Sequence, residues 1–240
     1  MRVLVLGGTA EARALAAALH GRAGTTVVSS LAGRVRDPKL PVGEVRVGGF
    51  GGPVKLAEWL VAERVDAVVD ATHPFAERIS ASAATASRER GVPLIMLRRP
   101  GWTPRPGWHP VPDLAAANRA AADLGERIFL TTGRQGLAVF ADTDRWFLVR
   151  CVDPPDPPLP KRMHLLLDRG PYTLEGELAL LREHRVDVLV TKDSGGPLTV
   201  AKLDAAEALG VPVVVVARPA PPDVPLVATV DEVLAWLDQR

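Results

Sequence analysis

Cysteine is almost absent from the chain, and its charges nearly cancel. Cys151 is the one cysteine in 240 residues, which excludes an intrachain disulfide and a cysteine-based zinc or iron–sulfur cage. The 29 Lys and Arg residues against 28 Asp and Glu residues leave a formal net charge of +1. Such a balance argues against a broad electrostatic footprint for nucleic acid or for a membrane surface, so we expect neither as a partner.

Long apolar runs are missing as well. The longest strongly apolar run lies around Val213 to Ala217 and is far too short to span a bilayer. The strand-like N-terminal segment has no apolar region with a cleavage site, so we expect no secretory signal and a cytoplasmic location. A hydrophobic share of 47% and a charged share of 24% are ordinary for a folded protein, which excludes wholesale disorder.

Three common enzyme signatures are also absent. The chain has no Gly-x-x-x-x-Gly-Lys-[Ser/Thr] P-loop and no His-Glu-x-x-His zinc motif. Tyr172 is the only tyrosine, and Gly176 stands four residues further on, where a short-chain dehydrogenase carries a lysine. These absences argue against three large enzyme classes.

What the chain has instead is an alternation of short valine-rich runs with amphipathic stretches rich in Ala, Leu, Glu and Arg. This alternation predicts repeated strand–helix units, and therefore an α/β fold with mainly parallel sheets flanked by helices. The predicted strands are Arg2–Leu6, Thr25–Ser29, Glu44–Val47, Ala67–Asp70, Pro93–Met96, Arg127–Thr131, Trp146–Val149, Val186–Val190 and Val211–Val216. The predicted helices are Ala10–Gly21, Pro53–Glu63, Phe75–Arg90, Asp113–Leu124, Gln135–Phe140, Thr173–His184, Thr199–Leu209 and Val230–Leu237.

The segment from Arg98 to Pro112 interrupts this alternation. Its first part has too many prolines and glycines for a helix or a central strand. We interpret the segment as a crossing between two lobes, residues 1–100 and residues 101–240, which look like two variations on one α/β theme. A flexible linker is the alternative, but Trp102 and Trp108 favour a packed loop.

The most informative local signal is a glycine turn between the first strand and its helix. Gly7, Gly8, Thr9 and Ala10 follow the apolar Val3–Leu6 run. Glycines without a Cβ atom let a diphosphate approach the backbone, and the N–H groups at a helix start favour an anion. The spacing departs from Gly-x-Gly-x-x-Gly, and a tight turn without a ligand is the alternative.

The end of the second strand indicates which dinucleotide would bind. An NAD-preferring site usually places a carboxylate there, whereas this chain has Ser29, Ser30, Gly33 and Arg34. Two hydroxyls and a guanidinium suit a 2′-phosphate, so the pattern favours NADP over NAD. A solvated surface arginine is the alternative for Arg34.

Two further loops at this predicted sheet edge carry candidate residues. Gly49 and Phe50 lie in a glycine-rich loop after the third strand, which would permit close approach of a cofactor or would simply be a flexible turn. Asp70, Thr72 and His73 follow the fourth strand, and ligands of open α/β sheets bind beyond such strand ends. Capping and packing of the next helix is the alternative.

Basic and hydroxyl side chains gather after two strands of the second lobe. They are Thr132, Gly133 and Arg134 after one strand, and Lys192, Ser194, Gly195 and, on the following helix, Lys202 after the other. Together they suit a substrate that bears carboxylates or phosphates. The alternative is helix capping by Thr132 and Ser194, with the lysines in solvent.

Taken in order, four motifs resemble those of the precorrin-6A reductase family. The motifs are Leu6-Gly7-Gly8-Thr9-Ala10-Glu11-Ala12, Asp70-Ala71-Thr72-His73-Pro74-Phe75-Ala76, Thr132-Gly133-Arg134 and Thr191-Lys192-Asp193-Ser194-Gly195-Gly196. The resemblance spans nearly the whole chain. It implies two Rossmann-like lobes, NADPH as the hydride donor, and a contracted-ring tetrapyrrole as the acceptor, reduced from precorrin-6A to precorrin-6B in cobalamin biosynthesis.

With this resemblance, the candidate residues fall into three groups. The NADPH-binding residues expected in lobe 1–100 are Gly7, Gly8, Thr9, Ala10, Ser29, Ser30, Gly33, Arg34, Gly49, Phe50 and Thr72. The tetrapyrrole-binding residues expected in lobe 101–240 are Thr132, Gly133, Arg134, Lys192, Ser194, Gly195 and Lys202. The expected proton donors are His73, Asp193 and Lys192, and Tyr172 and a solvent proton are further candidates.

Three alternatives stay open. One is the related branch that acts on the cobalt-bearing macrocycle, and another is a non-catalytic NADP(H)-binding module. A methyltransferase that uses S-adenosylmethionine would need an acidic residue after the second strand, which Ser29 and Ser30 do not offer. The expected reaction needs no metal site of the protein's own. Transient contact with neighbouring pathway enzymes is a further expectation.

Overall fold

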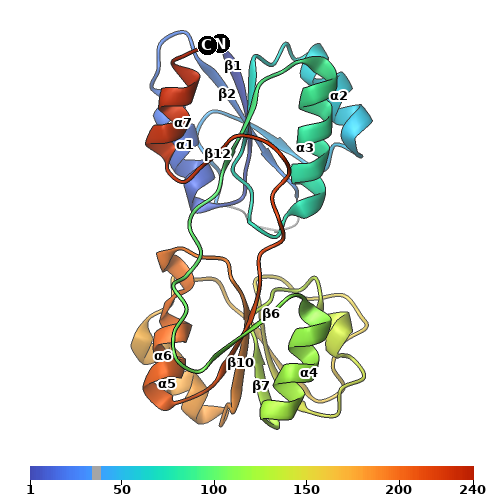
Figure 1. Ribbon diagram of the computed structural model, residues 1–240, viewed down its shortest axis with the longest axis vertical. Helices are drawn as coiled ribbons and strands as arrows, with labels where there is room; N and C mark the ends of the chain where they lie inside the picture. Colours follow the sequence, from blue (N-terminus) through green and yellow to red (C-terminus); the bar gives the residue numbers. More distant parts are fainter. Residues whose placement is uncertain (34–38) are drawn as a thin grey trace. The chain divides into compact units, whose positions relative to one another are not determined.

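The computed structural model describes residues 1–33 and 39–240. Two compact units make up this part of the chain. The first unit contains Met1–Pro100 and Pro219–Arg240, and the second contains Gly101–Arg218. Each unit is a parallel sheet covered by helices on both faces (Figure 1), so the predicted α/β fold with two Rossmann-like lobes is confirmed.

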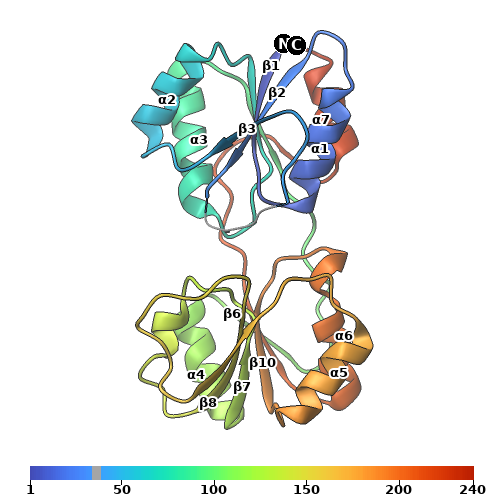
Figure 2. The same cartoon turned by 180° about the vertical axis from the view of Figure 1, so that it is seen from behind.

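The first unit has a six-stranded sheet in the order β12-β5-β4-β1-β2-β3, the strand order of dinucleotide-binding folds. Its strands are β1 (Arg2–Leu6), β2 (Thr26–Leu31), β3 (Glu44–Val47), β4 (Ala67–Asp70), β5 (Leu94–Leu97) and β12 (Leu226–Val227). Its helices are α1 (Ala10–His20), α2 (Pro53–Ala62), α3 (Glu77–Arg90) and α7 (Val230–Leu237). Helices α1 and α7 cover one face, and α2 and α3 cover the other (Figure 2).

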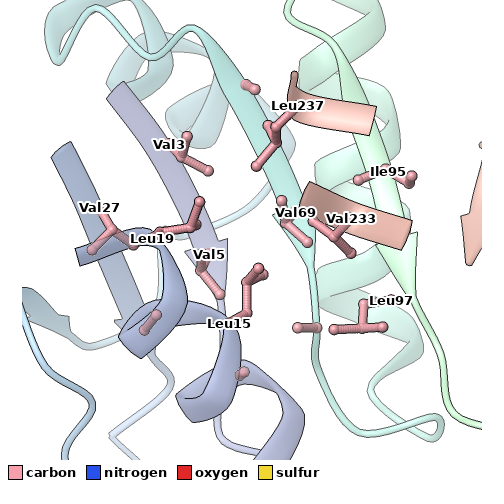
Figure 3. Packing of buried hydrophobic residues seen from close by; sticks show 14 residues of the cluster. Val3, Val5, Leu15, Leu19, Val27, Val69, Ile95, Leu97, Val233 and Leu237 are labelled. Carbon is pink, nitrogen blue, oxygen red and sulfur yellow. The ribbon is translucent and has the colours of Figure 1, made fainter. Parts of the chain in front are cut away.

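Alternation along β1 explains why both faces need a cover. Val3 and Val5 belong to the apolar cluster beneath α1 and α7, whereas Leu4 and Leu6 belong to the cluster beneath α2 and α3. All four side chains are essentially inaccessible, because successive side chains of a strand point to opposite faces. Figure 3 shows the first cluster, in which Val3 and Val5 lie opposite the apolar sides of α1 and α7.

The second unit repeats the design with the order β6-β11-β10-β7-β8-β9. Its strands are β6 (Trp108–Val111), β7 (Arg127–Leu130), β8 (Trp146–Cys151), β9 (Met163–Leu167), β10 (Val188–Lys192) and β11 (Val213–Val216). Its α-helices are α4 (Leu114–Leu124), α5 (Leu174–Glu183) and α6 (Ala201–Leu209), and its 3₁₀ turns are η1 (Leu137–Phe140) and η2 (Pro197–Thr199). Helices α5 and α6 pack side by side on one face, and α4 covers the other (Figure 1).

The second lobe was expected to run from residue 101 to residue 240, and this boundary is wrong for the last 22 residues. Residues from Pro219 onward belong to the first unit, where β12 pairs with the free edge of β5. Helix α7, which begins at a Thr229–Glu232 capping box, buries Val233 and Leu237 against the α1 face. The physical reason is the apolar surface beside α1, which the first hundred residues alone leave uncovered.

Three strands were not predicted, and each lies at a sheet edge. Strand β6 contains Pro110 and pairs only with β11, a position that tolerates proline because one side needs no N–H donor. Strand β9 pairs only with β8, and β12 only with β5. The predicted helix at Gln135–Phe140 is the 3₁₀ turn η1, and α3 begins at Glu77 rather than at Phe75. None of the described helices has the length and apolar character needed to cross a bilayer.

Candidate functional site

Each sheet has a switch point, where the connections from two neighbouring strands lead to opposite sides of the sheet. The predicted motifs lie at these two switch points. In the first unit, β1 leads to β2 on one side and lies beside β4 on the other. In the second unit, β7 and β10 are neighbours in the same way. Ligands of open α/β sheets bind beyond the strand ends at such points. The four motifs follow β1, β4, β7 and β10, so the sequence placed them correctly at strand ends.

The glycine turn after β1 is open to an incoming group. Gly8 has a φ of +112°, and a Cβ atom built there would meet no atom within 4 Å. The Thr9 hydroxyl is committed, because it donates to Ala71 O at 2.7 Å and accepts from Ala12 N at 3.1 Å. Thr9 therefore caps α1 and ties it to the loop after β4. Backbone N–H groups are what the turn offers to an anion.

Two serines lie next to the end of β2, and both are buried. The Ser29 hydroxyl has no hydrogen-bond partner within residues 1–33 and 39–240, an arrangement that costs free energy unless a ligand or water supplies one. Ser30 O accepts from Gly7 N at 2.9 Å and thereby joins this strand end to the glycine turn. Gly33 follows with a φ of +69°. Arg34, the expected partner of a 2′-phosphate, lies outside the described residues.

Arg46 on β3 was missed by the sequence analysis. Its guanidinium carbon lies 3.8 Å from the centre of the Phe50 ring. The guanidinium also donates to Gly48 O, to Gly49 O at 3.0 Å, and to the Ser30 hydroxyl at 3.5 Å. Glu44-Val45-Arg46-Val47 predicts an alternating strand with a solvated arginine, so no sequence signal identified this residue.

A cavity of about 210 Å³ lies beyond β4 and β5, with Asp70, Thr72 and His73 in its wall. Asp70 is 1% exposed; its Oδ1 accepts from Thr72 N at 3.1 Å and from Thr72 Oγ1 at 2.7 Å. Its Oδ2 has no hydrogen-bond partner in the described part of the chain. His73 is exposed, and its Nδ1 accepts from Phe75 N at 3.3 Å. The proton of the neutral ring therefore resides on Nε2.

In the second unit, Thr132, Arg134, Lys192 and Ser194 lie at the switch point between β7 and β10. Thr132 is buried, and its hydroxyl lacks a hydrogen-bond partner in the described residues. Burial lowers the pKa of the Lys192 ammonium, because a partly desolvated charge is less stable. Two cationic side chains and a buried hydroxyl at one strand edge suit an anionic ligand.

Asp193 has a different set of contacts from its neighbours. Its Oδ1 accepts from Trp102 N at 3.0 Å, and Arg218 Nε lies 3.2 Å from its Oδ2 and donates to its backbone oxygen at 2.7 Å. Trp102 and Arg218 lie near the two ends of the second unit in the sequence. Asp193 therefore fastens both segments that connect this unit to the rest of the chain. A Cβ atom on Gly101 would come within 2.5 Å of the carboxylate.

Lys202 lies inside the second unit rather than in solvent. It is 4% exposed, and its ammonium donates to Thr199 O at 2.9 Å and lies 5.1 Å from the Trp102 ring centre. Burial lowers its pKa to about 7, and the nearby Arg150 guanidinium adds to the effect. Arg150, which the sequence analysis missed, forms a buried ion pair with Glu177. The ammonium of Lys202 is therefore withdrawn from the surface on which a substrate would lie.

Comparison with known proteins identifies the family. The model of the family "Precorrin-6x reductase CbiJ/CobK" matches residues 2–238.

The chain belongs to this family.

Relatives and a solved structure of the family agree with this assignment. A precorrin-6A reductase of Rhodococcus erythropolis is 60% identical over 242 residues, which cover 98% of this chain and 97% of the relative. A cobalt-precorrin-6A reductase of Priestia megaterium is 31% identical over 233 residues, 90% of each chain. The solved structure "CobK precorrin-6A reductase" is 42% identical, with a TM-score of 0.92 over 100% of this chain and 96% of the other.

Family membership confirms the resemblance that the four ordered motifs indicated. The chain is therefore an oxidoreductase. A reductase of this family implies a nicotinamide cofactor. The first unit, with its open glycine turn and the strand order of a dinucleotide-binding fold, has the features that such a cofactor requires.

Proposed function

We propose that the chain uses NADPH to reduce precorrin-6A to precorrin-6B in cobalamin biosynthesis. The observation that carries this proposal is that one chain of this family has two sheets whose strand ends carry different chemical groups. One edge has an open glycine turn, and the other carries cationic side chains and a buried hydroxyl at neighbouring strand ends. A dinucleotide suits the first edge, and the peripheral carboxylates of a tetrapyrrole suit the second.

In this proposal the first unit holds NADPH along its strand ends. The N–H groups that follow Gly7 and Gly8 receive the diphosphate, and the buried Ser29 hydroxyl supplies a hydrogen bond that it lacks within the described residues. The cavity bounded by Asp70, Thr72 and His73 receives the nicotinamide end. When bound, NADPH supplies the hydride. The protein's part is to orient the ring and exclude water.

The second unit binds the macrocycle in this proposal. Arg134, Lys192 and Ser194 contact carboxylates of the substrate, with Thr132, Gly133 and Gly195 shaping the loops around them. Lys202 acts from inside the unit through its charge, because its side chain is buried. A cytoplasmic location and transient contact with neighbouring pathway enzymes belong to the same proposal.

Reduction of a carbon–carbon double bond also needs a proton. We place it on Lys192 or His73: burial lowers the pKa of Lys192, and His73 is exposed at the wall of the cavity. The contacts of Asp193 favour a positioning role instead. Replacing Lys192 by Met or His73 by Ala tests the two assignments. Replacement of the residue that donates the proton should lower turnover at saturating substrates.

The test of the function itself is NADPH oxidation in the presence of precorrin-6A. We expect loss of NADPH absorbance only when precorrin-6A is present, with a product that has gained a pair of hydrogen atoms by mass. Cobalt-precorrin-6A in a parallel reaction tests the related branch. Binding of NADPH without its oxidation on either macrocycle would instead indicate a non-catalytic module.

A further inference from the structure

We propose that Arg46 is a specificity-determining residue that binds the 2′-phosphate of the nucleotide. The inference rests on the proposed use of NADPH and adds a residue for which neither the sequence motifs nor the family match gives a role. It is carried by three observations on the guanidinium: its fixed orientation, its lack of an ion pair with any described carboxylate, and its place beside the end of β2.

The guanidinium is held in one orientation before any ligand arrives. Its plane lies against Phe50, with 3.8 Å between the guanidinium carbon and the ring centre. Phe50 is itself buried and packs edge-on against Trp59. Nη1 donates to the carbonyl oxygen of Gly48 and Nη2 to that of Gly49, so hydrogen bonds hold both arms of the fork. A preorganised fork loses little entropy when it binds a phosphate.

No carboxylate in the described part of the chain forms an ion pair with Arg46. Several other partly buried arginines lie against carboxylates, for example Arg99 with Glu11 and Arg218 with Asp193. Arg46 forms no ion pair with any described residue, and every group that accepts its hydrogen bonds is neutral. A fixed, half-buried cation without a counter-charge is a site for an anion.

The position selects the kind of anion. Arg46 is paired in register with Ser30, and Ser30 with Leu6 at the end of β1. The guanidinium therefore lies one strand beyond the β2 end, where dinucleotide-binding folds hold the adenosine ribose. The Ser30 hydroxyl, 3.5 Å from the guanidinium, offers a second contact to a phosphate there. NADPH has a phosphate monoester on this ribose, and NADH has a hydroxyl.

The test is calorimetric titration of NADPH, NADH, 2′,5′-ADP and 5′-AMP into the wild-type chain and into Arg46→Met. Methionine keeps an unbranched apolar side chain over Phe50 and removes the charge. We expect NADPH and 2′,5′-ADP to bind about tenfold to a hundredfold more weakly to the variant, as for a lost charge-assisted contact. NADH and 5′-AMP should change by less than about threefold. Arg88→Met, an exposed arginine in the last turn of α3, is the control for the change in net charge.

Each other outcome overturns the inference in a distinct way. Equal weakening of all four nucleotides would show that Arg46 only fastens the Gly48–Phe50 loop. An unchanged preference in Arg46→Met, together with a lost preference in Arg34→Ala, would assign the phosphate to Arg34. A wild-type chain that binds neither NADPH nor 2′,5′-ADP would defeat the proposed function itself, not only the role of Arg46.

If Arg46→Met does not fold, a measurement on the wild-type chain still tests the role of Arg46. Nuclear magnetic resonance of the arginine Nε–H groups should show a shift of the Arg46 signal with 2′,5′-ADP and none with 5′-AMP. The same signal unmoved by both ligands, while 2′,5′-ADP binds by calorimetry, would overturn the assignment.

Discussion

Replacement of Lys202 by Met should stabilise the protein, and more so in acid than in base. Lys202 is 4% exposed, and its pKa is lowered from 10.5 to about 7 by burial and by Arg150. Below pH 7 the ammonium stays charged in both the folded and the unfolded chain, so the folded state bears the full cost of burying it. As the pH rises from about 7 towards 10.5, the folded chain loses this proton first, and the free energy of unfolding increases.

The size of the effect follows from the pKa. A change of one in pKa corresponds to about 1.4 kcal/mol, so the fall to about 7 sets an upper limit of roughly 5 kcal/mol on the cost of the buried charge. Relaxation and water entry reduce such costs, and Lys202→Met also loses the hydrogen bond to Thr199 O and the contact with the Trp102 ring. We expect a gain of about 2 kcal/mol at pH 6 and little or none at about pH 9.5.

Urea unfolding at the two pH values, followed by tryptophan fluorescence, measures this difference. Trp102 lies beside the replaced ammonium and reports on the second unit. Lys161→Met is the matched control, because the Lys161 side chain is 79% exposed and its replacement should be neutral at both pH values. An equal effect of Lys202→Met at the two pH values, or a loss of stability at pH 6, would refute a buried ammonium as the cause.

The remaining predictions concern Asp193 and Leu237. Asp193→Asn removes the carboxylate that contacts the mostly buried Arg218 and should lower the free energy of unfolding by about 1–3 kcal/mol, with NADPH affinity unchanged by calorimetry. Lost turnover at full stability would instead show that Asp193 takes part in the chemistry. Leu237→Ala removes a side chain that is 2% exposed beneath α1 and should cost about 2–4 kcal/mol by urea unfolding. A cost below about 1 kcal/mol would contradict the packing of α7 on the first unit.

Much of the fold was open to prediction from the chain alone. The central strands β1, β4, β7 and β10 are short apolar runs with side chains buried on both faces, and that pattern is local. The edge strands β6, β9 and β12 were missed, whereas β3, also at an edge, was predicted; the missed strands are partly exposed, and β6 contains a proline. Pairing with a neighbour defines such strands, and the neighbour is distant in the sequence.

The candidate site divides in the same way. The Gly8 turn was recognisable because a turn depends on residues close in the chain. Thr9 was expected to bind the cofactor, whereas its hydroxyl caps α1 and donates to Ala71 O. Arg46 was not recognisable, because its proposed role comes from its contact with Phe50 and from the lack of an ion pair with a carboxylate among the described residues. Lys202 was expected at the surface, and only the packing of α6 shows that its ammonium is buried. Burial and charge balance are properties of the assembled chain.

By itself, the sequence determined the alternation of strands and helices, the motifs at the strand ends and the family, because each depends on residues that are near neighbours or on their order. The tertiary structure decided that residues from Pro219 onward complete the first unit and that Asp193 contacts both Trp102 and Arg218. It also decided that Arg46 stacks on Phe50 and forms no ion pair within the described residues. Each of these depends on which distant surfaces meet, since apolar burial and charge pairing act through space rather than along the chain.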